Sequence, residues 1–149
     1  MTCDTRPLYT IAMAAELLSV HPRTLRLYEA AGLLKPARRN NRRLYSKSDL
    51  EWVRCMRFLM HEKGLNQEGL RRLLARTPCW EIRGCTEEMI ANCAAPKERT
   101  CPCWALDEEQ RAREDGRCYG CEVYNIARRS VCNKEEMAQA ATYGPELPI

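Results

Sequence analysis

The apolar residues in the first half of the chain recur at helical spacing in four successive segments. Each segment opens on a residue that suits the start of a helix, because it can accept a free backbone N–H or lacks one. These residues are, in order, Thr10, Pro22, Ser46 together with Asp49, and Asn66. The first three helices should end at Leu18, before Gly32 and at Gly64. The pattern therefore predicts a mainly α-helical fold.

The first two helices are joined by a tight turn over residues 19–21. Helix, short turn and helix is the helix-turn-helix arrangement, in which the second helix lies in the major groove of DNA. Arg23, Thr24 and Arg26 lie near the start of that second helix, where they could face the groove.

A two-stranded wing is expected between the second and third helices. Asn40 and Asn41 favour a tight turn, because asparagine tolerates the positive φ that short hairpins require. Four arginines flank this pair, and at the tip of a wing they could touch phosphate. They are Arg38, Arg39, Arg42 and Arg43.

The charge of the chain is divided unevenly about Arg76. Residues 1–76 contain 15 Lys and Arg against 7 Asp and Glu, a net charge of +8, and the remaining residues contain 9 against 13, a net charge of −4. A basic segment suits a polyanion, because each phosphate that it neutralises releases counterions. No segment is apolar enough to span a bilayer or to serve as a secretion signal. We therefore expect a cytoplasmic protein with a DNA-binding domain in residues 1–76 and no membrane partner.

The DNA-binding domain of the MerR family of transcription regulators resembles this chain from Leu8 to Ala75, about half its length. In family members a strand and a helix are followed by the sequence motif TLRxYExxGLLxPxR and then by the motif RxYxxxDL. This chain reads YTIAMAAELLSVHPRTLRLYEAAGLLKPARRNNRRLYSKSDLEWV, and its NRRLYS is closer to heat-shock-repressor-like members. The resemblance implies a winged helix-turn-helix of four helices and a small β wing.

The same resemblance assigns roles to individual residues. It implies that Arg26 and Tyr28 meet DNA from the recognition helix, and that Arg38, Arg43 and Tyr45 serve the wing. Family members bind double-stranded promoter DNA as homodimers, and many affect RNA polymerase indirectly by distorting the promoter.

The chain departs from the family after the fourth helix. Members usually continue into a long helix that pairs with the dimer mate, but Thr77, Pro78 and Gly84 interrupt this chain. The cysteine-rich second half could supply the dimer contacts instead.

Residues 77–142 are expected to form a small irregular or helical module held by metal. They contain eight of the ten cysteines and no histidine. In a reducing cytosol, metal ligation explains such thiols better than disulfides do. All-sulfur coordination suits Zn²⁺ or an iron–sulfur cluster, and one turn could aim Cys118 and Cys121 at a single metal.

The second half contains Cys-Trp-Glu-Ile, a second cysteine six residues after the first, and a later Cys-Pro. This pattern is similar to small two-CW cysteine modules of anaerobic bacteria, for which iron–sulfur binding is suspected. By that similarity the favoured ligands are Cys79, Cys85, Cys101 and Cys118. The further candidates are Cys93, Cys103, Cys121 and Cys132. Four aromatic rings could keep water off a cluster: Trp80, Trp104, Tyr119 and Tyr124. Cys55 is expected to be core, and Cys3 a free thiol.

Three short helices are expected to join the proposed ligands. Thr86 can cap residues 87–92, Asp107 can cap a polar helix that ends at Gly116, and Asn133 with Glu136 can cap a last helix through residue 141. Residues 143–149 should be a flexible tail.

These features predict a regulator whose [4Fe–4S] cluster senses redox state, or its own assembly and loss, and alters promoter geometry. Two alternatives remain for the cysteines: structural zinc in a dimerisation or partner-docking module, and thiol–disulfide switching without metal. An enzyme that uses Cys118 and Cys121 as a dithiol oxidoreductase is disfavoured, because no thioredoxin-like strand pattern or catalytic constellation accompanies them.

Overall fold

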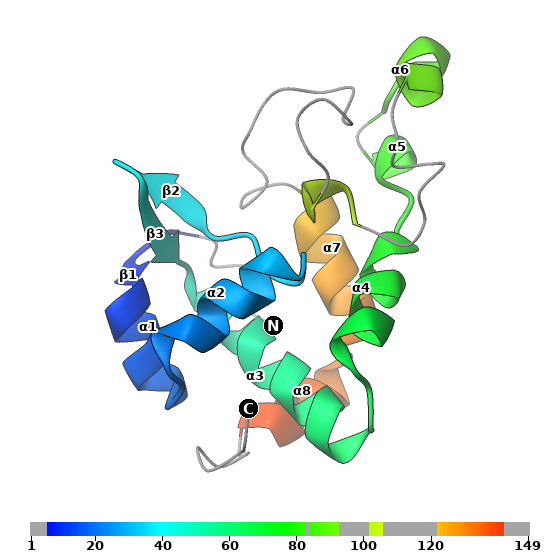
Figure 1. Ribbon diagram of the computed structural model, residues 1–149. Helices are drawn as coiled ribbons and strands as arrows, with labels where there is room; N and C mark the ends of the chain where they lie inside the picture. The colour runs from blue at the N-terminus through cyan, green and yellow to red at the C-terminus, as the bar shows by residue number, and fades with distance from the viewer. Residues whose placement is uncertain (1–5, 83, 93–101, 106–121, 142–149) are drawn as a thin grey trace.

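The computed structural model describes residues 6–82, 84–92, 102–105 and 122–141. Most of these residues are helical, with one small sheet, and no described helix is long and apolar enough to cross a membrane (Figure 1). In chain order the elements are β1 (Tyr9–Thr10), α1 (Ile11–Leu18), α2 (Pro22–Ala30), β2 (Ala37–Arg39), β3 (Arg42–Tyr45), α3 (Lys47–Glu62), α4 (Gln67–Ala75), α5 (Cys79–Ile82), α6 (Glu87–Asn92), the 3-10 helix η1 (Cys103–Ala105), α7 (Glu122–Val131) and α8 (Lys134–Ala141).

The helix starts predicted from the sequence are confirmed. The Oγ1 atom of Thr10 accepts the N–H of Met13 at 3.3 Å at the start of α1, and Asn66 does the same for Gly69 at 2.7 Å at the start of α4. Ser46 and Asp49 form a capping box at the start of α3, in which each side chain accepts the backbone N–H of the other residue, at 3.1 and 3.0 Å.

The wing is confirmed as an antiparallel hairpin of β2 and β3, which β1 extends to a sheet of order β1-β3-β2. Arg39 pairs with Arg42 at its end, and φ is 51° at Asn40 and 62° at Asn41. Two consecutive positive φ angles give a two-residue turn that matches the twist of the strands.

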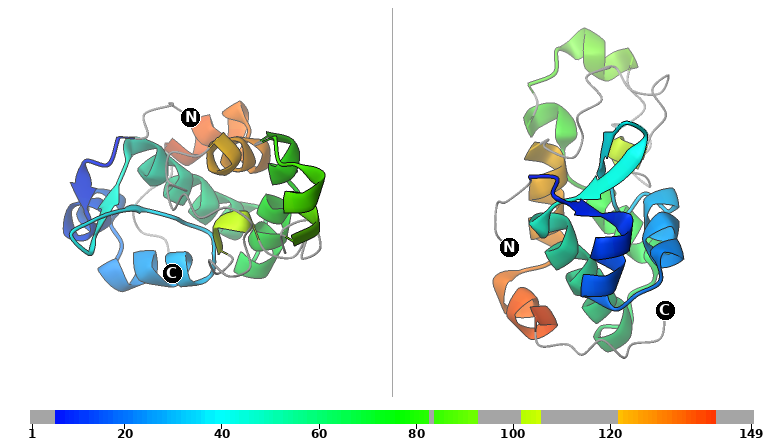
Figure 2. Two further views of the ribbon diagram at one scale, coloured as in Figure 1. Left: turned by 90° about the horizontal axis from the view of Figure 1, so that it is seen from above. Right: turned by 90° about the vertical axis from the view of Figure 1, so that its left-hand side faces the viewer.

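The last two helices pack against the N-terminal half of the chain. α8 lies along α3 and α7 lies along α4, as Figure 2 shows from two sides. Buried residues of the second half, such as Trp104, Tyr124 and Ala127, belong to the same hydrophobic cluster as Leu25 and Leu33. The described part of residues 77–142 therefore shares one core with residues 1–76.

The remaining short helices differ in how far they were predicted. Thr86 caps α6, and Asn133 with Glu136 caps α8 through two reciprocal hydrogen bonds of 3.0 and 2.9 Å, as expected. α7 was not predicted. The helix expected from Asp107 to Gly116 and the expected tail of residues 143–149 lie outside the described residues.

A buried ion pair fixes α7 to the start of α3. The Nη1 atom of Arg128 lies 3.0 Å from Oδ1 of Asp49, and their side chains are 0% and 3% exposed. Tyr124 also donates its hydroxyl to Asp49, at 3.3 Å. Burial raises the pKa of Asp49, while Arg128 and the hydrogen bonds from Ser46 act in the opposite direction. The carboxylate that caps α3 thus also anchors the C-terminal part of the chain.

Replacing Arg128 by methionine should lower the free energy of unfolding by about 3–5 kcal/mol, because it leaves the carboxylate of Asp49 buried without its counterion. Urea unfolding followed by circular dichroism measures the change. Adding Asp49→Asn to Arg128→Met should recover part of the loss, and Arg23→Met, at an exposed position of α2, is the control. Equal stabilities of the Arg128→Met and Arg23→Met variants would contradict the role given to the ion pair.

Candidate nucleic-acid interface

The turn between α1 and α2 sets the direction of the second helix. Ser19 ends α1 with a φ of 54°, and the N–H of Val20 donates to Ala15 O at 2.9 Å. His21 then caps α2, because its Nδ1 atom accepts the N–H of Arg23 at 3.1 Å. The turn expected over residues 19–21 is therefore present, and both Arg23 and Arg26 are exposed on α2.

The wing is tied to α2 by a carboxylate that the sequence analysis did not single out. Glu29 of α2 accepts from Nη2 of Arg38 at 2.9 Å with one oxygen and from Nε of Arg43 with the other. The sequence does point to Glu29 as a partner for these arginines, because it is the sole carboxylate between Glu16 and Asp49. This double ion pair fixes the angle between the helix and the hairpin.

The tip of the wing carries the remaining two arginines. Arg39 and Arg42 are exposed on either side of the turn, and Arg38 keeps 49% of its side chain accessible despite its bond to Glu29. Only 26% of the Arg43 side chain is accessible. The outer wing is therefore a basic surface, while Arg43 lies at its base.

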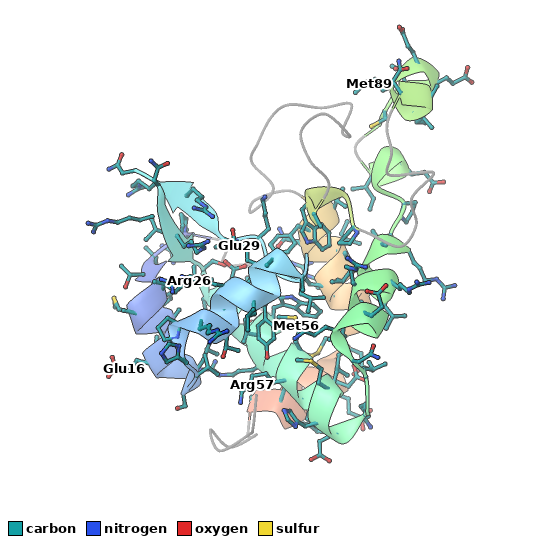
Figure 3. All side chains as sticks on the ribbon, viewed as in Figure 1. Glu16, Arg26, Glu29, Met56, Arg57 and Met89 are labelled. Atoms are coloured by element: carbon teal, nitrogen blue, oxygen red, sulfur yellow. A yellow bond between two sulfur atoms is a disulfide. The ribbon has the colours of Figure 1, made fainter. Side chains whose placement is uncertain are left out.

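A cavity of about 320 Å³ separates α2 from the base of the wing. Arg26, Lys35 and Arg43 line it with three cations, Glu29 is its carboxylate, and Trp104 closes part of the wall. Figure 3 labels Arg26 and Glu29 on α2. Because the cations outnumber the carboxylate, the cavity favours an anion such as a phosphate group.

The structure corrects three of the predicted DNA contacts. Thr24 is 1% exposed, Tyr28 is 2% exposed and Tyr45 is 0% exposed. Burial raises the pKa of Tyr28 and of Tyr45 above the usual value of a tyrosine, as expected for phenols in an apolar core. These side chains cannot reach a base or a phosphate from where they lie, and they support the helix and the wing from within.

Residues of the C-terminal half hold the joint between α2 and the wing. The indole N–H of Trp104 donates to Gly32 O at 2.8 Å, and the hydroxyl of Tyr124 accepts the N–H of Lys35 at 2.9 Å. The two rings form an edge-to-face pair with centroids 4.9 Å apart. The structure thus places both rings against residues 1–76, and their expected role beside a cluster stays a prediction.

Gly32 permits this close approach. Its φ is 77°, and a Cβ atom built on it would lie 2.6 Å from Cβ of Ala105. Any side chain here would push η1 away from the joint, and the positive φ would strain it as well.

Two cysteines are paired in the core. Cys55 of α3 and Cys132, which follows α7, form a disulfide with their Cα atoms 6.5 Å apart. Cys55 is therefore more than a core thiol, and Cys132 could offer a thiolate to a metal only after this disulfide is reduced.

The other proposed ligands are only partly visible. Cys85 is a half-buried free thiol, Cys79 lies in α5 and Cys103 in η1. Outside the described residues lie Cys93, Cys101, Cys118 and Cys121. Within the ranges that the structure describes, no three His, Cys, Asp or Glu side chains gather as a metal site would require.

Comparison with known proteins concerns the N-terminal half. Residues 9–77 match the family model described as MerR HTH family regulatory protein. Over 75 residues the chain is 41% identical to the putative heat shock protein HspR of Streptomyces coelicolor, an alignment that covers 50% of this chain and 49% of that protein.

Two further relatives match the same half. They are the uncharacterized HTH-type transcriptional regulator YyaN of Bacillus subtilis, 38% identical over 45% of this chain and 49% of the relative, and the HTH-type transcriptional regulator GlnR of Bacillus anthracis, 33% identical over 46% and 53%. The chain spans about half the length of the curated relatives it matches. Two of these names describe transcriptional regulators and none of the three describes an enzyme, in agreement with the sequence prediction. No solved structure matches the chain.

The substitution Tyr45→Phe tests whether Tyr45 lies in the core and makes no contact with DNA. Among the described residues its buried hydroxyl has no hydrogen-bond partner, so its removal should raise the free energy of unfolding by roughly 1 kcal/mol or leave it unchanged. Duplex DNA binding should be unchanged as well, because the ring stays in the core. A drop in DNA affinity without a drop in stability would restore the direct contact.

Proposed function

We propose, starting from the MerR-type helix-turn-helix domain that residues 9–77 form, that this chain is a transcription regulator that binds double-stranded promoter DNA. The observation that carries the proposal is the basic surface of α2 and the wing. Arg23 and Arg26 are exposed on the helix, and Arg39 and Arg42 are exposed at the tip of the wing. An exposed helix next to an arginine-rich hairpin suits a major groove with its flanking phosphates.

The two parts of this surface have different tasks in the proposal. α2 enters the major groove, where Arg23 and Arg26 reach base edges or nearby phosphates. The wing contacts the backbone through Arg38, Arg39 and Arg42. Glu29 contacts no DNA but holds the wing at a fixed angle to α2. A rigid angle between two contacts lets the protein favour DNA that is bent or twisted to match.

We assign metal binding to the cysteine-rich second half. It contains eight cysteines and no histidine, and an all-thiolate ligand set suits an iron–sulfur cluster or zinc. Cys79, Cys85, Cys101 and Cys118 are the proposed ligands, and Cys93, Cys103 and Cys121 are further candidates. A [4Fe–4S] cluster would supply a one-electron change that can be sensed. The contacts of Trp104 and Tyr124 with the α2–wing joint give such a change a route to the DNA-binding surface.

A homodimer on a two-fold promoter site is part of the proposal, with RNA polymerase affected indirectly through promoter geometry. α4 is followed by the four-residue α5 and not by a long helix, so the dimer contacts must come from another surface. The proposal also places the chain in the cytosol, because bacterial promoter DNA lies there.

The wing is tested by Arg42→Ala. If Arg42 neutralises a phosphate, its loss should weaken binding to duplex DNA of any sequence and lower the slope of log affinity against log salt by about 1. Fluorescence anisotropy with a labelled duplex of random sequence, titrated at several salt concentrations, gives this slope. The matched control is Arg72→Ala on α4, on the far side of the molecule from the wing in Figure 1. Unmodified protein that binds duplex DNA without salt dependence would refute the proposed function.

The metal is tested by anaerobic purification followed by a visible spectrum and by iron, sulfide and zinc analysis. A brown protein that contains iron and sulfide is expected, and the Cys118→Ser, Cys121→Ser double variant should lose colour and metal. Cys3→Ser, outside the cysteine-rich half, is the control. A colourless protein with bound zinc would replace the sensor by a structural module, and a folded protein free of metal would refute metal binding altogether.

A further inference from the structure

We propose that Cys55 and Cys132 form a reversible disulfide that locks α7 and α8 onto the DNA-binding half and thereby raises the affinity for DNA. The proposal rests on the proposed function for its DNA readout. It does not depend on a metal, because Cys55 lies outside the cysteine-rich half and Cys132 lies outside the four favoured ligands.

The pair joins parts of the chain that are distant in sequence. Cys55 lies within α3, Cys132 lies in the turn between α7 and α8, and 77 positions separate them. The two residues are 0% and 3% exposed and belong to the main hydrophobic cluster. The disulfide therefore connects the longest helix of the DNA-binding half to the point where α7 ends and α8 begins.

The disulfide is expected to be reversible because the proposed function places the protein in the reducing cytosol. Disulfides of cytosolic proteins are mostly transient and catalytic or redox-sensing, because the thiol pool reduces them. Oxidation removes two electrons and two protons from the cysteines. With a small disulfide such as oxidised glutathione, one thiolate attacks to form a mixed disulfide and releases one glutathione thiol. The second protein thiolate then displaces the other glutathione, which completes the Cys55–Cys132 bond.

The burial of both sulfurs imposes a gate on this exchange. Neither sulfur can meet glutathione while α8 covers α3, so α8 must first lift away. α8 is an eight-residue helix with mostly exposed described side chains, and a short element that buries so little surface opens locally at low cost. Exchange should therefore be slower than for an exposed thiol and faster than global unfolding.

The consequence for DNA follows from the contacts of α7. Between its start and Cys132 this helix carries Tyr124, which binds Lys35, and Arg128, which binds Asp49. Trp104 packs on Tyr124 and binds Gly32. Gly32 and Lys35 belong to the segment that leads from α2 into β2. A fixed α7 therefore holds the recognition helix and the wing at a set angle before DNA arrives, and preorganisation of this kind raises affinity.

The chemistry is tested first, without DNA. The full-length protein is equilibrated in glutathione buffers of graded redox potential, alkylated and analysed by peptide mass spectrometry. We expect a Cys55–Cys132 peptide that appears under oxidising buffers and disappears under reducing ones. Both cysteines alkylated as free thiols throughout the series, or a cross-link that reduced glutathione never removes, would overturn the proposal.

The effect on DNA is tested by anisotropy titration of the oxidised and the reduced protein with a labelled random-sequence duplex. Allosteric coupling typically changes affinity on the order of fivefold to a hundredfold, and we expect tighter binding by the oxidised form within that range. Cys55→Ser, which keeps all eight cysteines of the second half, should bind like the reduced protein in both buffers. Cys55→Ala serves the same purpose if serine is poorly tolerated in the core. The control is Ser130→Ala on α7, an exposed position that should keep the full response.

The outcomes separate the two proposals. A cross-link that forms and breaks without any change in DNA affinity overturns the inference and leaves the regulator intact. A redox response that persists in Cys55→Ser assigns the response to the other cysteines and also overturns it. Absence of salt-sensitive duplex binding in both redox states refutes the proposed function itself, while the mass spectrometry still decides whether the pair exchanges.

Discussion

The structure depends on the ion pair between Asp49 and Arg128. Asp49 accepts the N–H of Ser46, the guanidinium of Arg128 and the hydroxyl of Tyr124, so one carboxylate caps the start of α3 and anchors α7. Burying two charges carries a large desolvation cost, which only several good hydrogen bonds offset. Such a pair tolerates little displacement, and it therefore defines the position of α7 more sharply than apolar packing alone would.

What the sequence predicted correctly is local. A cap acts over three residues, and a hairpin turn needs two residues with positive φ, so Thr10, Asn66 and the pair Asn40–Asn41 carry their structural meaning in their immediate neighbours. The mainly helical fold with a small wing followed from such signals. The resemblance to the MerR family added the arrangement of these elements, which local signals do not contain.

What the sequence could not predict depends on partners far along the chain. Arg128 lies beside the exposed Arg129 in the sequence, and the carboxylate that balances its buried charge is Asp49, 79 positions earlier. Tyr45 follows three residues of the wing hairpin that are half-buried or exposed, and its burial depends on how β3 lies over the core. The pairing of Cys55 with Cys132 is of the same kind, since cysteine spacing alone does not specify connectivity.

The shared core changes how a signal from the second half would act. A sensor on a flexible linker alters DNA binding mainly by changing how often two independent parts meet, whereas here Trp104 and Tyr124 are bonded to the backbone of Gly32 and Lys35. Because close-packed interiors transmit displacement, a movement of α7 must either break those bonds or shift the α2–wing joint with it. The angle between α2 and the wing is thus a property of the whole described chain, and a change in that angle needs no hinge between two domains.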